Sequence, residues 1–304
     1  MKTVAVILPA FNSGDSIVLQ IASILAQKDV ILTLFLMDDA STDGTQQKLD
    51  KISASFPNVH LIYPSKKLGS ASASFFYMLN ALEEELKNFQ YVAFADHDDI
   101  WMPHKITEGI SRLEKDGSDG YSSQFCSVRY TFFSGLAEAA LSNKGTASTG
   151  MDHYFEGPSA GCTFILSAAL YSELVGLISH PEVAEKLGRV FWHDWFTYMF
   201  AVERGFKWSI DSRGYIFYMQ SDSNETGVNR GLSAAVKRLK LLFSGWYLAQ
   251  IVLMLDIISP SAEIGLRLQR RSFGDKLYFL KRIFLIRRRV THCFLVYITI
   301  LATL

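Results

Sequence analysis

The sequence predicts an α/β protein with a mostly parallel central sheet, and three observations support that fold class. Short apolar runs alternate with segments whose apolar residues recur at helical spacing over the first hundred residues. This alternation of strand and helix is typical of an α/β domain. Acidic residues cluster directly after two of the runs, at the sheet edge where open α/β folds bind ligands. An apolar content of 49% and a charged content of 20% indicate a folded chain.

The expected elements follow one another without an internal repeat. Strands are expected over four apolar runs: 3–8, 31–37, 60–63 and 91–95. Helices are expected over the three segments that separate these runs: 16–27, 45–56 and 69–86. At 304 residues, the chain has room for one large domain, or for a domain with an appendage.

Three carboxylates end the strand at 91–95, because Asp96, Asp98 and Asp99 follow it with only His97 between them. Burying a carboxylate unpaired costs several kcal/mol, so we expect a cation to relieve the repulsion. Divalent cations such as Mg²⁺ or Mn²⁺ prefer carboxylate oxygens and bridge to phosphates. Asp96 and Asp98 are therefore predicted as metal ligands. The alternative is an acidic turn that caps a helix expected to start near Pro103.

A second acidic group follows the strand at 31–37 and contains Asp38, Asp39 and Asp43. A carboxylate at this edge can accept a hydrogen bond from a nucleobase or from a ribose hydroxyl. We expect Asp39 to do so, while Thr42 or Asp43 caps the following helix.

Four segments, taken in order, resemble the family 2 glycosyltransferases of the GT-A fold: 9–12, 38–45, Gly69 with its small-residue helix, and 95–101. The Asp-Asp-Ile-Trp ending at 98–101 is most similar to the bacterial rhamnosyltransferase-like branch. The resemblance covers about residues 1–227 and implies a nucleoside-diphosphate sugar donor, a divalent cation and inversion at the anomeric carbon. It also implies the residues that bind the nucleotide sugar: Pro9, Ala10, Phe11, Asn12, Asp39, Gly69 and Asp96.

The aromatic segment 191–196 contains one carboxylate, Asp194. Burial raises the pKa of a carboxylate toward neutral pH, which suits a general base. The resemblance implies that an acidic residue in this region deprotonates the acceptor, and we assign that role to Asp194. The alternative is a core helix whose first turn Asp194 caps. The residues expected at the acceptor are Asp99, Trp101, Gly161, His193 and Trp195.

The segment 157–161 also fits the Gly-x-Ser-x-Gly pattern of serine hydrolases. That motif needs a strand before it and a helix after it, whereas an apolar strand pattern follows here. The resemblance instead implies a glycine turn that lets the backbone approach the acceptor or the diphosphate.

The last segment that the resemblance covers is 218–227, in which related enzymes often carry a His directly after the Gln that corresponds to Gln220. This chain has Ser221 there, so the third metal ligand stays open between Asp222, His193 and water. Arg230 is expected to pair with the diphosphate, because a guanidinium matches phosphate geometry.

The C-terminal region, 228–304, differs in charge from the rest of the chain. It carries 13 Lys+Arg and 3 Asp+Glu, a net of +10, so residues 1–227 carry the other 17 and 27, a net of −10. Basic and apolar residues alternate over 276–289, which predicts a helix that lies in the interface of an anionic membrane. We expect Phe279, Ile283, Phe284 and Ile286 to insert. The alternatives are a membrane span or a helical dimerisation arm, and the region has no nucleic-acid-binding motif.

The residues and the resemblance together predict an inverting glycosyltransferase domain at 1–227 and a membrane-associating helical tail at 228–304. Three widely spaced cysteines, Cys126, Cys162 and Cys293, favour a reducing compartment, so a cytoplasmic enzyme at the inner face of the membrane is expected. The expected reaction moves rhamnose from dTDP-rhamnose to a lipid-linked or polysaccharide acceptor. The alternatives are a UDP-hexose donor and an inactive nucleotide-sugar binder. A homo-oligomer is possible.

Overall fold

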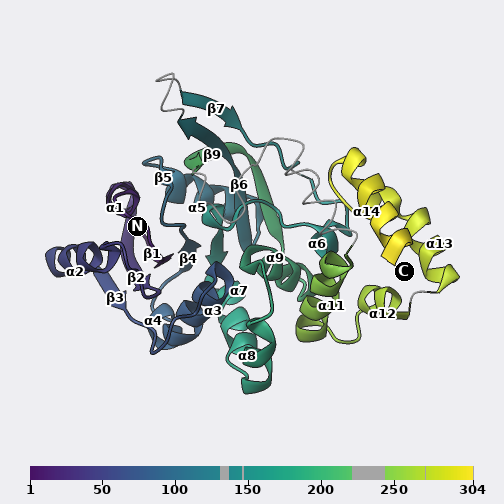
Figure 1. Cartoon of the computed structure of the whole chain (residues 1–304). Helices are drawn as coiled ribbons and strands as arrows, with labels where there is room; N and C mark the ends of the chain where they lie inside the picture. Colours follow the sequence, from purple (N-terminus) through teal and green to yellow (C-terminus); the bar gives the residue numbers. More distant parts are fainter. Residues whose placement is uncertain (131–136, 146, 221–243, 271, 304) are drawn as a thin grey trace.

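A mixed sheet forms the centre of the molecule in the computed structural model, which describes residues 1–130, 137–145, 147–220, 244–270 and 272–303 (Figure 1). Its strands, in the order in which they pair, are β3 (Val59–Ile62), β2 (Val30–Asp38), β1 (Lys2–Ala10), β4 (Tyr91–Phe94), β8 (Ile165–Ser167), β6 (Gly120–Tyr130), β9 (Trp208–Gln220) and β5 (Ile100–Trp101). The strand β7 (Ala137–Leu141) pairs with β6 outside this order. The predicted α/β fold class is confirmed, and the first four strands begin within one residue of their expected positions.

The first half of the sheet is parallel and the second half is mixed. β3, β2, β1 and β4 run parallel, β8 runs antiparallel to both of its neighbours, and β9 is parallel to β6. The carboxyl ends of β1, β2 and β4 therefore meet at one edge, where the predicted acidic turns begin.

Helices cover both faces of the sheet. Successive side chains of β1 point to opposite faces and are buried on both. One face carries Val4, Val6 and Leu8, and packs against α1 (Ser16–Leu25), α2 (Thr45–Ser55) and α5 (Lys105–Asp116). The other carries Ala5 and Ile7, and packs against α3 (Ala71–Ala81), α7 (Ala168–Ile178) and α9 (His193–Glu203). The remaining short helices before residue 220 are α4 (Glu83–Leu86), α6 (Asp152–Phe155), α8 (Pro181–Leu187) and a 3₁₀ turn (Gly161–Thr163).

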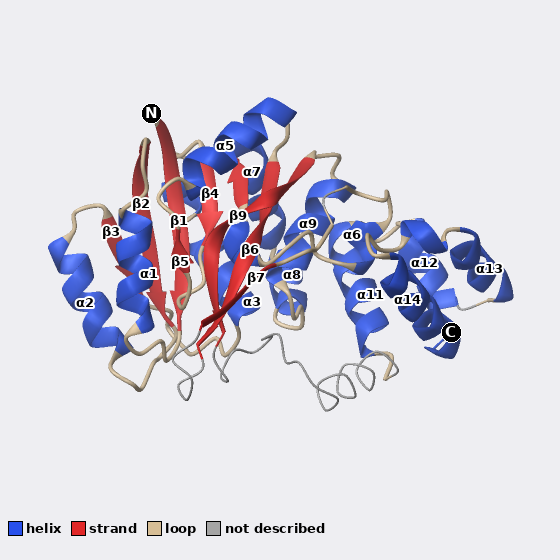
Figure 2. Cartoon of the chain, turned by 90° about the horizontal axis from the view of Figure 1, so that it is seen from above, coloured by secondary structure: helices blue, strands red, loops and turns tan. Residues whose placement is uncertain are grey.

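The C-terminal helices gather at the end of the molecule opposite α2 (Figure 2). They are α11 (Trp246–Ile258), α12 (Glu263–Arg270), α13 (Phe273–Lys281) and α14 (Val290–Thr303), with a 3₁₀ turn (Ile283–Leu285) before α14. A reciprocal capping box starts α13, since Ser272 accepts from the backbone of Asp275 and the Asp275 side chain accepts from the backbone of Ser272. Their buried side chains, Ile251 and Ile300 among them, join the core cluster that also contains Ala5 and Ile7.

The prediction of which tail residues insert into a membrane is wrong for three of four side chains. Phe279 and Ile286 are 0% exposed and Ile283 is 7% exposed, because they pack against the rest of the chain. Phe284 is 58% exposed. Within the described residues, none of the helices combines the length and the hydropathy that are needed to cross a bilayer.

A buried arginine fastens the C-terminal helices to the rest of the chain. The Arg288 side chain is 1% exposed, and its Nη1 lies 2.6 Å from Oδ2 of Asp152, which is fully buried at the start of α6. The guanidinium also donates to the carbonyl oxygens of Gly157 at 2.5 Å and Lys144 at 3.0 Å. Asp152 accepts a further hydrogen bond from the Tyr198 hydroxyl on α9 at 3.0 Å. One side chain therefore joins the C-terminal region, α6 and the loop at 157–161.

Candidate active site

A cavity of about 880 Å³ lies at the carboxyl edge of β1, β2 and β4, and residues from both halves of the chain line it. Most of the residues that were predicted from the sequence lie on its walls: Pro9, Ala10, Phe11, Asn12, Asp39, Gly69, Asp96, Asp98, Asp99, Gly161, His193 and Asp194. Trp101 and Trp195 are not among the lining residues. Ser221, Asp222 and Arg230 lie outside the described residues.

Hydrogen bonds between the turns after β1 and β2 hold one wall of the cavity in place. The Asn12 side chain accepts from the backbone of Thr42 at 2.8 Å, and the Ser41 hydroxyl accepts from the backbone of Asn12 at 2.9 Å. Asp43 accepts from the backbone of Gly14 at 2.8 Å. Asn12 (φ 48°) and Ala40 (φ 58°) both take up the left-handed conformation, which is uncommon outside glycine. The two turns thus form one preformed unit.

The Asp39 carboxylate is already engaged by the backbone of the next loop. Its oxygens accept from the amides of Leu68 at 2.5 Å and Gly69 at 2.8 Å, and Gly69 has a φ of 81°. Asp39 therefore shapes the glycine turn that lines the cavity. Each carboxylate oxygen still has a second lone pair, so a nucleoside can be an additional partner.

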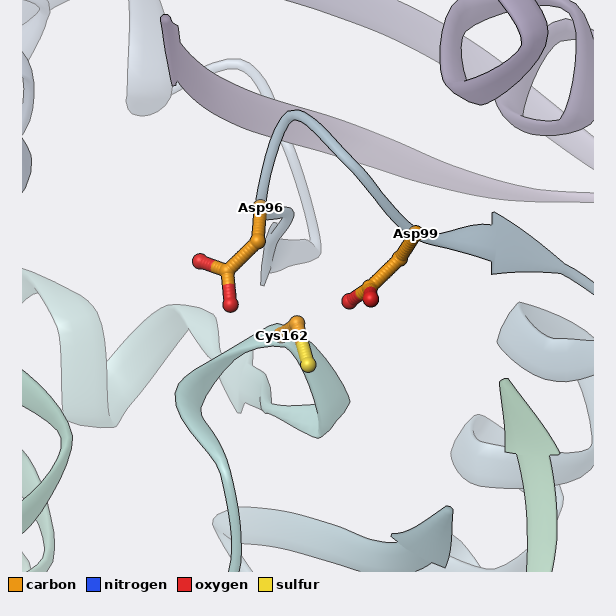
Figure 3. A group of neighbouring side chains, drawn as sticks. All are labelled: Asp96, Asp99 and Cys162. Carbon is orange, nitrogen blue, oxygen red and sulfur yellow. The ribbon is translucent and has the colours of Figure 1, made fainter. Parts of the chain in front are cut away.

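Asp96, Asp99 and Cys162 form a close cluster, as Figure 3 shows, and the two carboxylates line the cavity. One ligand atom from each lies within 4.8 Å of those of the other two. Burial and the neighbouring carboxylates raise the pKa of Asp96 and of Asp99, burial raises the pKa of Asp98, and burial raises the pKa of the Cys162 thiol. Carboxylates that are crowded in this way fit a divalent cation, which would favour their ionised form. Asp99, which was predicted at the acceptor, is 1% exposed, belongs to this cluster and lines the cavity.

A buried lysine, Lys105, lies near the acidic cluster and was not predicted from the sequence. Lys105 is 0% exposed, and its Nζ lies 3.5 Å from the centre of the Trp101 ring. Burial lowers the pKa of Lys105 to about 7, although Cys162, Asp99 and Asp96 attract its charge. Trp101 is 3% exposed and packs on this amine, so the structure does not support its assignment to the acceptor. A lysine at the start of a predicted helix gives no signal of burial.

Asp194 lies in the first turn of α9, on the wall that the second half of the chain provides. Burial raises the pKa of Asp194 to about 6, and a hydrogen bond from the Trp195 amide and the charge of Lys144 oppose that rise. A carboxylate with this pKa can accept a proton near neutral pH. The placement is compatible with a general base.

His193 and Gly161 pack around Asp194. The His193 ring stacks on Phe75 with 3.9 Å between ring centres, and burial lowers its pKa to about 3, so the ring is neutral. A Cβ on Gly161 would lie 2.6 Å from Nε2 of His193 and 3.2 Å from Cβ of Asp194. Only glycine fits there without displacing the start of α9.

Trp195 faces the core instead of the cavity. It is 4% exposed, and its indole N–H donates to the carbonyl oxygen of His153 at 2.8 Å. Its prediction as an acceptor-binding residue is therefore not supported.

The serine-hydrolase alternative finds no support at 157–161. The Ser159 hydroxyl donates to the carbonyl oxygen of Ser123 at 2.6 Å, and the residue is 5% exposed. Gly157 follows the helix α6, whereas a nucleophile elbow follows a strand.

Comparisons with known proteins agree with the geometry. The family model for glycosyl transferase family 2 matches residues 5–144. The dTDP-rhamnosyl transferase RfbG of Shigella flexneri is 30% identical over 262 residues, which are 86% of this chain and 88% of that protein. The UDP-Glc:alpha-D-GlcNAc-diphosphoundecaprenol beta-1,3-glucosyltransferase WfaP of Escherichia coli is 31% identical over 116 residues, 38% of this chain and 43% of that protein.

A solved structure supports the fold. The S. aureus TarS 1–349 in complex with UDP superposes with a TM-score of 0.54 at 15% identity, and the match covers 100% of this chain and 89% of that one. The family model and the long match to RfbG show that the chain belongs to glycosyl transferase family 2 and is a glycosyltransferase.

Proposed function

We propose that this protein transfers rhamnose from dTDP-rhamnose, with inversion, to a hydroxyl of a lipid-linked or polysaccharide acceptor at the inner face of the cell membrane. The observation that carries the proposal is that Asp194 and the acidic turn 96–99 line one cavity. The donor is suggested by the name of RfbG, and the lipid-linked acceptor by the name of WfaP.

In this proposal the first half of the chain holds the donor. The turn 9–12, Asp39 and Gly69 contact the nucleoside, and Asp96 with Asp98 or Asp99 holds Mg²⁺ or Mn²⁺. The bound cation supplies positive charge that stabilises the leaving diphosphate. Arg230 is proposed as a further diphosphate contact.

The second half of the chain holds and activates the acceptor. The acceptor hydroxyl attacks the anomeric carbon from the face opposite the diphosphate, so that one C–O bond forms while the bond to the diphosphate oxygen breaks. Asp194 accepts the hydroxyl proton, and neutral His193 lies beside it as a hydrogen-bonding group for the acceptor. Only the deprotonated carboxylate of Asp194 can accept this proton, so protonation of Asp194 would slow the reaction.

The test combines binding and transfer. A thermal-shift panel of nucleoside diphosphates and their sugars, with Mn²⁺ or Mg²⁺, should give the largest stabilisation with the thymidine compounds, because a ligand that binds only the folded state raises its stability. Transfer of radiolabelled rhamnose from dTDP-rhamnose should follow, and NMR of the product should show the inverted anomer. Stabilisation and transfer with UDP-hexoses alone would replace the rhamnose donor by the UDP-hexose alternative. Donor binding without transfer or hydrolysis would indicate an inactive binder.

A further inference from the structure

We propose that α13, the turn after it and α14 present a face that docks on the surface of an anionic lipid bilayer. This inference rests on the proposed reaction at the inner face of the cell membrane, and it names the side chains of the C-terminal region that make the contact. They differ from those that the sequence predicted, since Phe279, Ile283 and Ile286 are buried.

One side of α14 is apolar and exposed along its whole length. Val290, Phe294, Ile298 and Leu301 follow one another at spacings of four, four and three residues, so they share one side of the helix. Phe294 is 48% exposed and Ile298 is 50% exposed, whereas Cys293, Val296 and Ile300 on the other side are buried. No residue of α14 carries a formal charge at neutral pH except when His292 is protonated. Nothing described covers this side.

α13 and the turn after it also expose apolar side chains. Phe273, Leu277 and Leu280 are exposed along it, and Phe284 follows in the next turn. The rings of Phe284 and Phe294 meet edge to face with 5.9 Å between their centres. Figure 1 shows α13 and α14 beside each other at the end of the molecule, and the two helices are in contact. We call the exposed apolar residues of α13 and α14, together with Phe284, the docking face.

Basic side chains border the docking face. At 100° per residue, Lys276 and Lys281 lie about 70° to either side of the stripe formed by Phe273, Leu277 and Leu280. This order of cation, apolar stripe and cation is the arrangement of helices that lie in the membrane interface. The long lysine side chains can reach lipid phosphates while the stripe inserts.

The surrounding charge is one-sided. Between residues 264 and 303 the sequence has a single acidic side chain, Asp275, and it is 0% exposed and paired with Arg267 and Arg270. Arg287 and Arg288 are paired with Glu156 and Asp152. Lys276, Lys281, Arg282 and Arg289 have no carboxylate partner among the described residues.

This charge distribution favours a lipid surface over a symmetric second copy. A twofold dimer through the docking face would bring together the basic borders of both copies, with no exposed carboxylate between residues 264 and 303 to offset them, which is unfavourable. Anionic headgroups supply the missing negative charge, and each basic residue near them contributes about fivefold in binding. α14 spans only about 21 Å along its axis, less than the hydrocarbon core, so it lies along the surface.

The test measures co-sedimentation of the full chain with vesicles of phosphatidylcholine alone, or of phosphatidylcholine mixed with phosphatidylglycerol, at low and high salt. The charge variant Lys276→Glu/Lys281→Glu should bind the anionic vesicles at least about twenty-five-fold more weakly, and its binding should depend less on salt. The apolar variant Phe294→Gln/Ile298→Gln should lose about tenfold to a hundredfold at either salt concentration.

Matched controls separate the docking face from the rest of the surface. Phe56 (44% exposed) and Ile31 (51% exposed) lie at the other end of the chain, so Phe56→Gln/Ile31→Gln has the same chemistry at the same exposure. Lys51→Glu/Lys115→Glu is the control for charge. Neither control should change vesicle binding. Equal losses in the controls, or equal binding of the wild type to neutral and anionic vesicles, would overturn the proposal.

Two further measurements make the outcome unambiguous. Light scattering of the free protein should give a mass that the apolar variant leaves unchanged, and a dimer that this variant dissociates would identify the docking face as a contact between copies and refute the lipid proposal. Transfer to a soluble acceptor should be the same in all variants. If every form, including the wild type, fails to transfer rhamnose but binds vesicles as expected, the proposed donor is wrong and the docking face stands.

Discussion

Replacement of Arg288 by methionine isolates the contribution of the buried ion pair to stability. The change keeps an unbranched side chain of similar length but removes the guanidinium that contacts Asp152, Gly157 and Lys144. Burial would raise the pKa of Asp152, but hydrogen bonds from Ser148 and the charge of Arg288 more than offset that effect and hold the pKa below its usual value. Without Arg288, a fully buried carboxylate keeps hydrogen bonds but loses its counter-charge.

The size of the effect follows from that burial. Breaking a buried pair by removing one partner costs about 3–5 kcal/mol, because an uncompensated charge stays in the interior. With an unfolding entropy of about 2.1 cal/mol/K per residue, this loss lowers the melting temperature of a chain of this length by about 5–8 °C. The double variant Arg288→Met/Asp152→Asn removes both charges and should recover much of that loss.

Differential scanning calorimetry of the two single variants and the double variant gives the coupling between the side chains. Arg112→Met is the matched control, because Arg112 pairs with Asp116 at 39% and 27% exposure and should cost less than about 1 kcal/mol. If Arg288→Met melts within a degree of the wild type, or if the double variant shows the sum of the single losses, the buried pair does not stabilise the protein in the way described.

Three further predictions concern the proposed reaction. Asp194→Asn should lower the rate of transfer by about a hundredfold to ten-thousandfold and leave donor affinity within a few-fold, and loss of donor affinity at unchanged turnover would make Asp194 a binding residue. In the wild type, kcat/KM should rise with pH through about 6 and then level off, because only the deprotonated carboxylate accepts a proton. Asp98→Asn should lower metal-dependent transfer by at least about a hundredfold and weaken Mn²⁺ binding in calorimetry, and full activity of this variant with the metal chelated would remove Asp98 from the metal site. Gly161→Ala should lower kcat by about ten- to a hundredfold at unchanged donor affinity, because the new methyl group displaces His193 and Asp194; Gly176→Ala on α7, where a Cβ meets nothing within 4 Å, is the control, and equal effects of both would mean that space at Gly161 is not the cause.

The sequence was sufficient to predict the features that depend on neighbouring residues. The strand at 91–94 and the carboxylates after it are contiguous, so apolar pattern and charge identify both together. Asp194 can be identified in a similar way, because it is the one carboxylate within the aromatic segment 191–196. Aromatic residues do not reveal whether they stack on a sugar or fill the core, and Trp101 and Trp195 were assigned to the wrong environment for that reason.

Features that depend on distant partners could not be predicted. Arg288 lies in a basic run that looks solvated, but its partner Asp152 is 136 positions earlier in the chain. Lys105 is buried near Asp96, Asp99 and Cys162, which come together from two separate segments of the chain. Pairings of this kind are set by the tertiary fold, and neither residue type nor periodicity contains them.

The left-handed backbone at Ala40 affects how tightly the cavity can hold a ligand. A residue with a Cβ in this conformation costs about 1–2 kcal/mol relative to a relaxed one. The hydrogen bonds of Asn12 with Ser41 and Thr42 maintain the turn in the ligand-free protein, so the free energy cost of this conformation belongs to folding and not to ligand binding. A ligand that contacts this wall encounters rigid backbone and loses no affinity to the ordering of these two turns. Asn12→Ala would remove the hydrogen bond that the Asn12 side chain accepts from Thr42, so ligand binding would then have to order the two turns. The expected result is weaker affinity, even for a ligand that does not touch the Asn12 side chain.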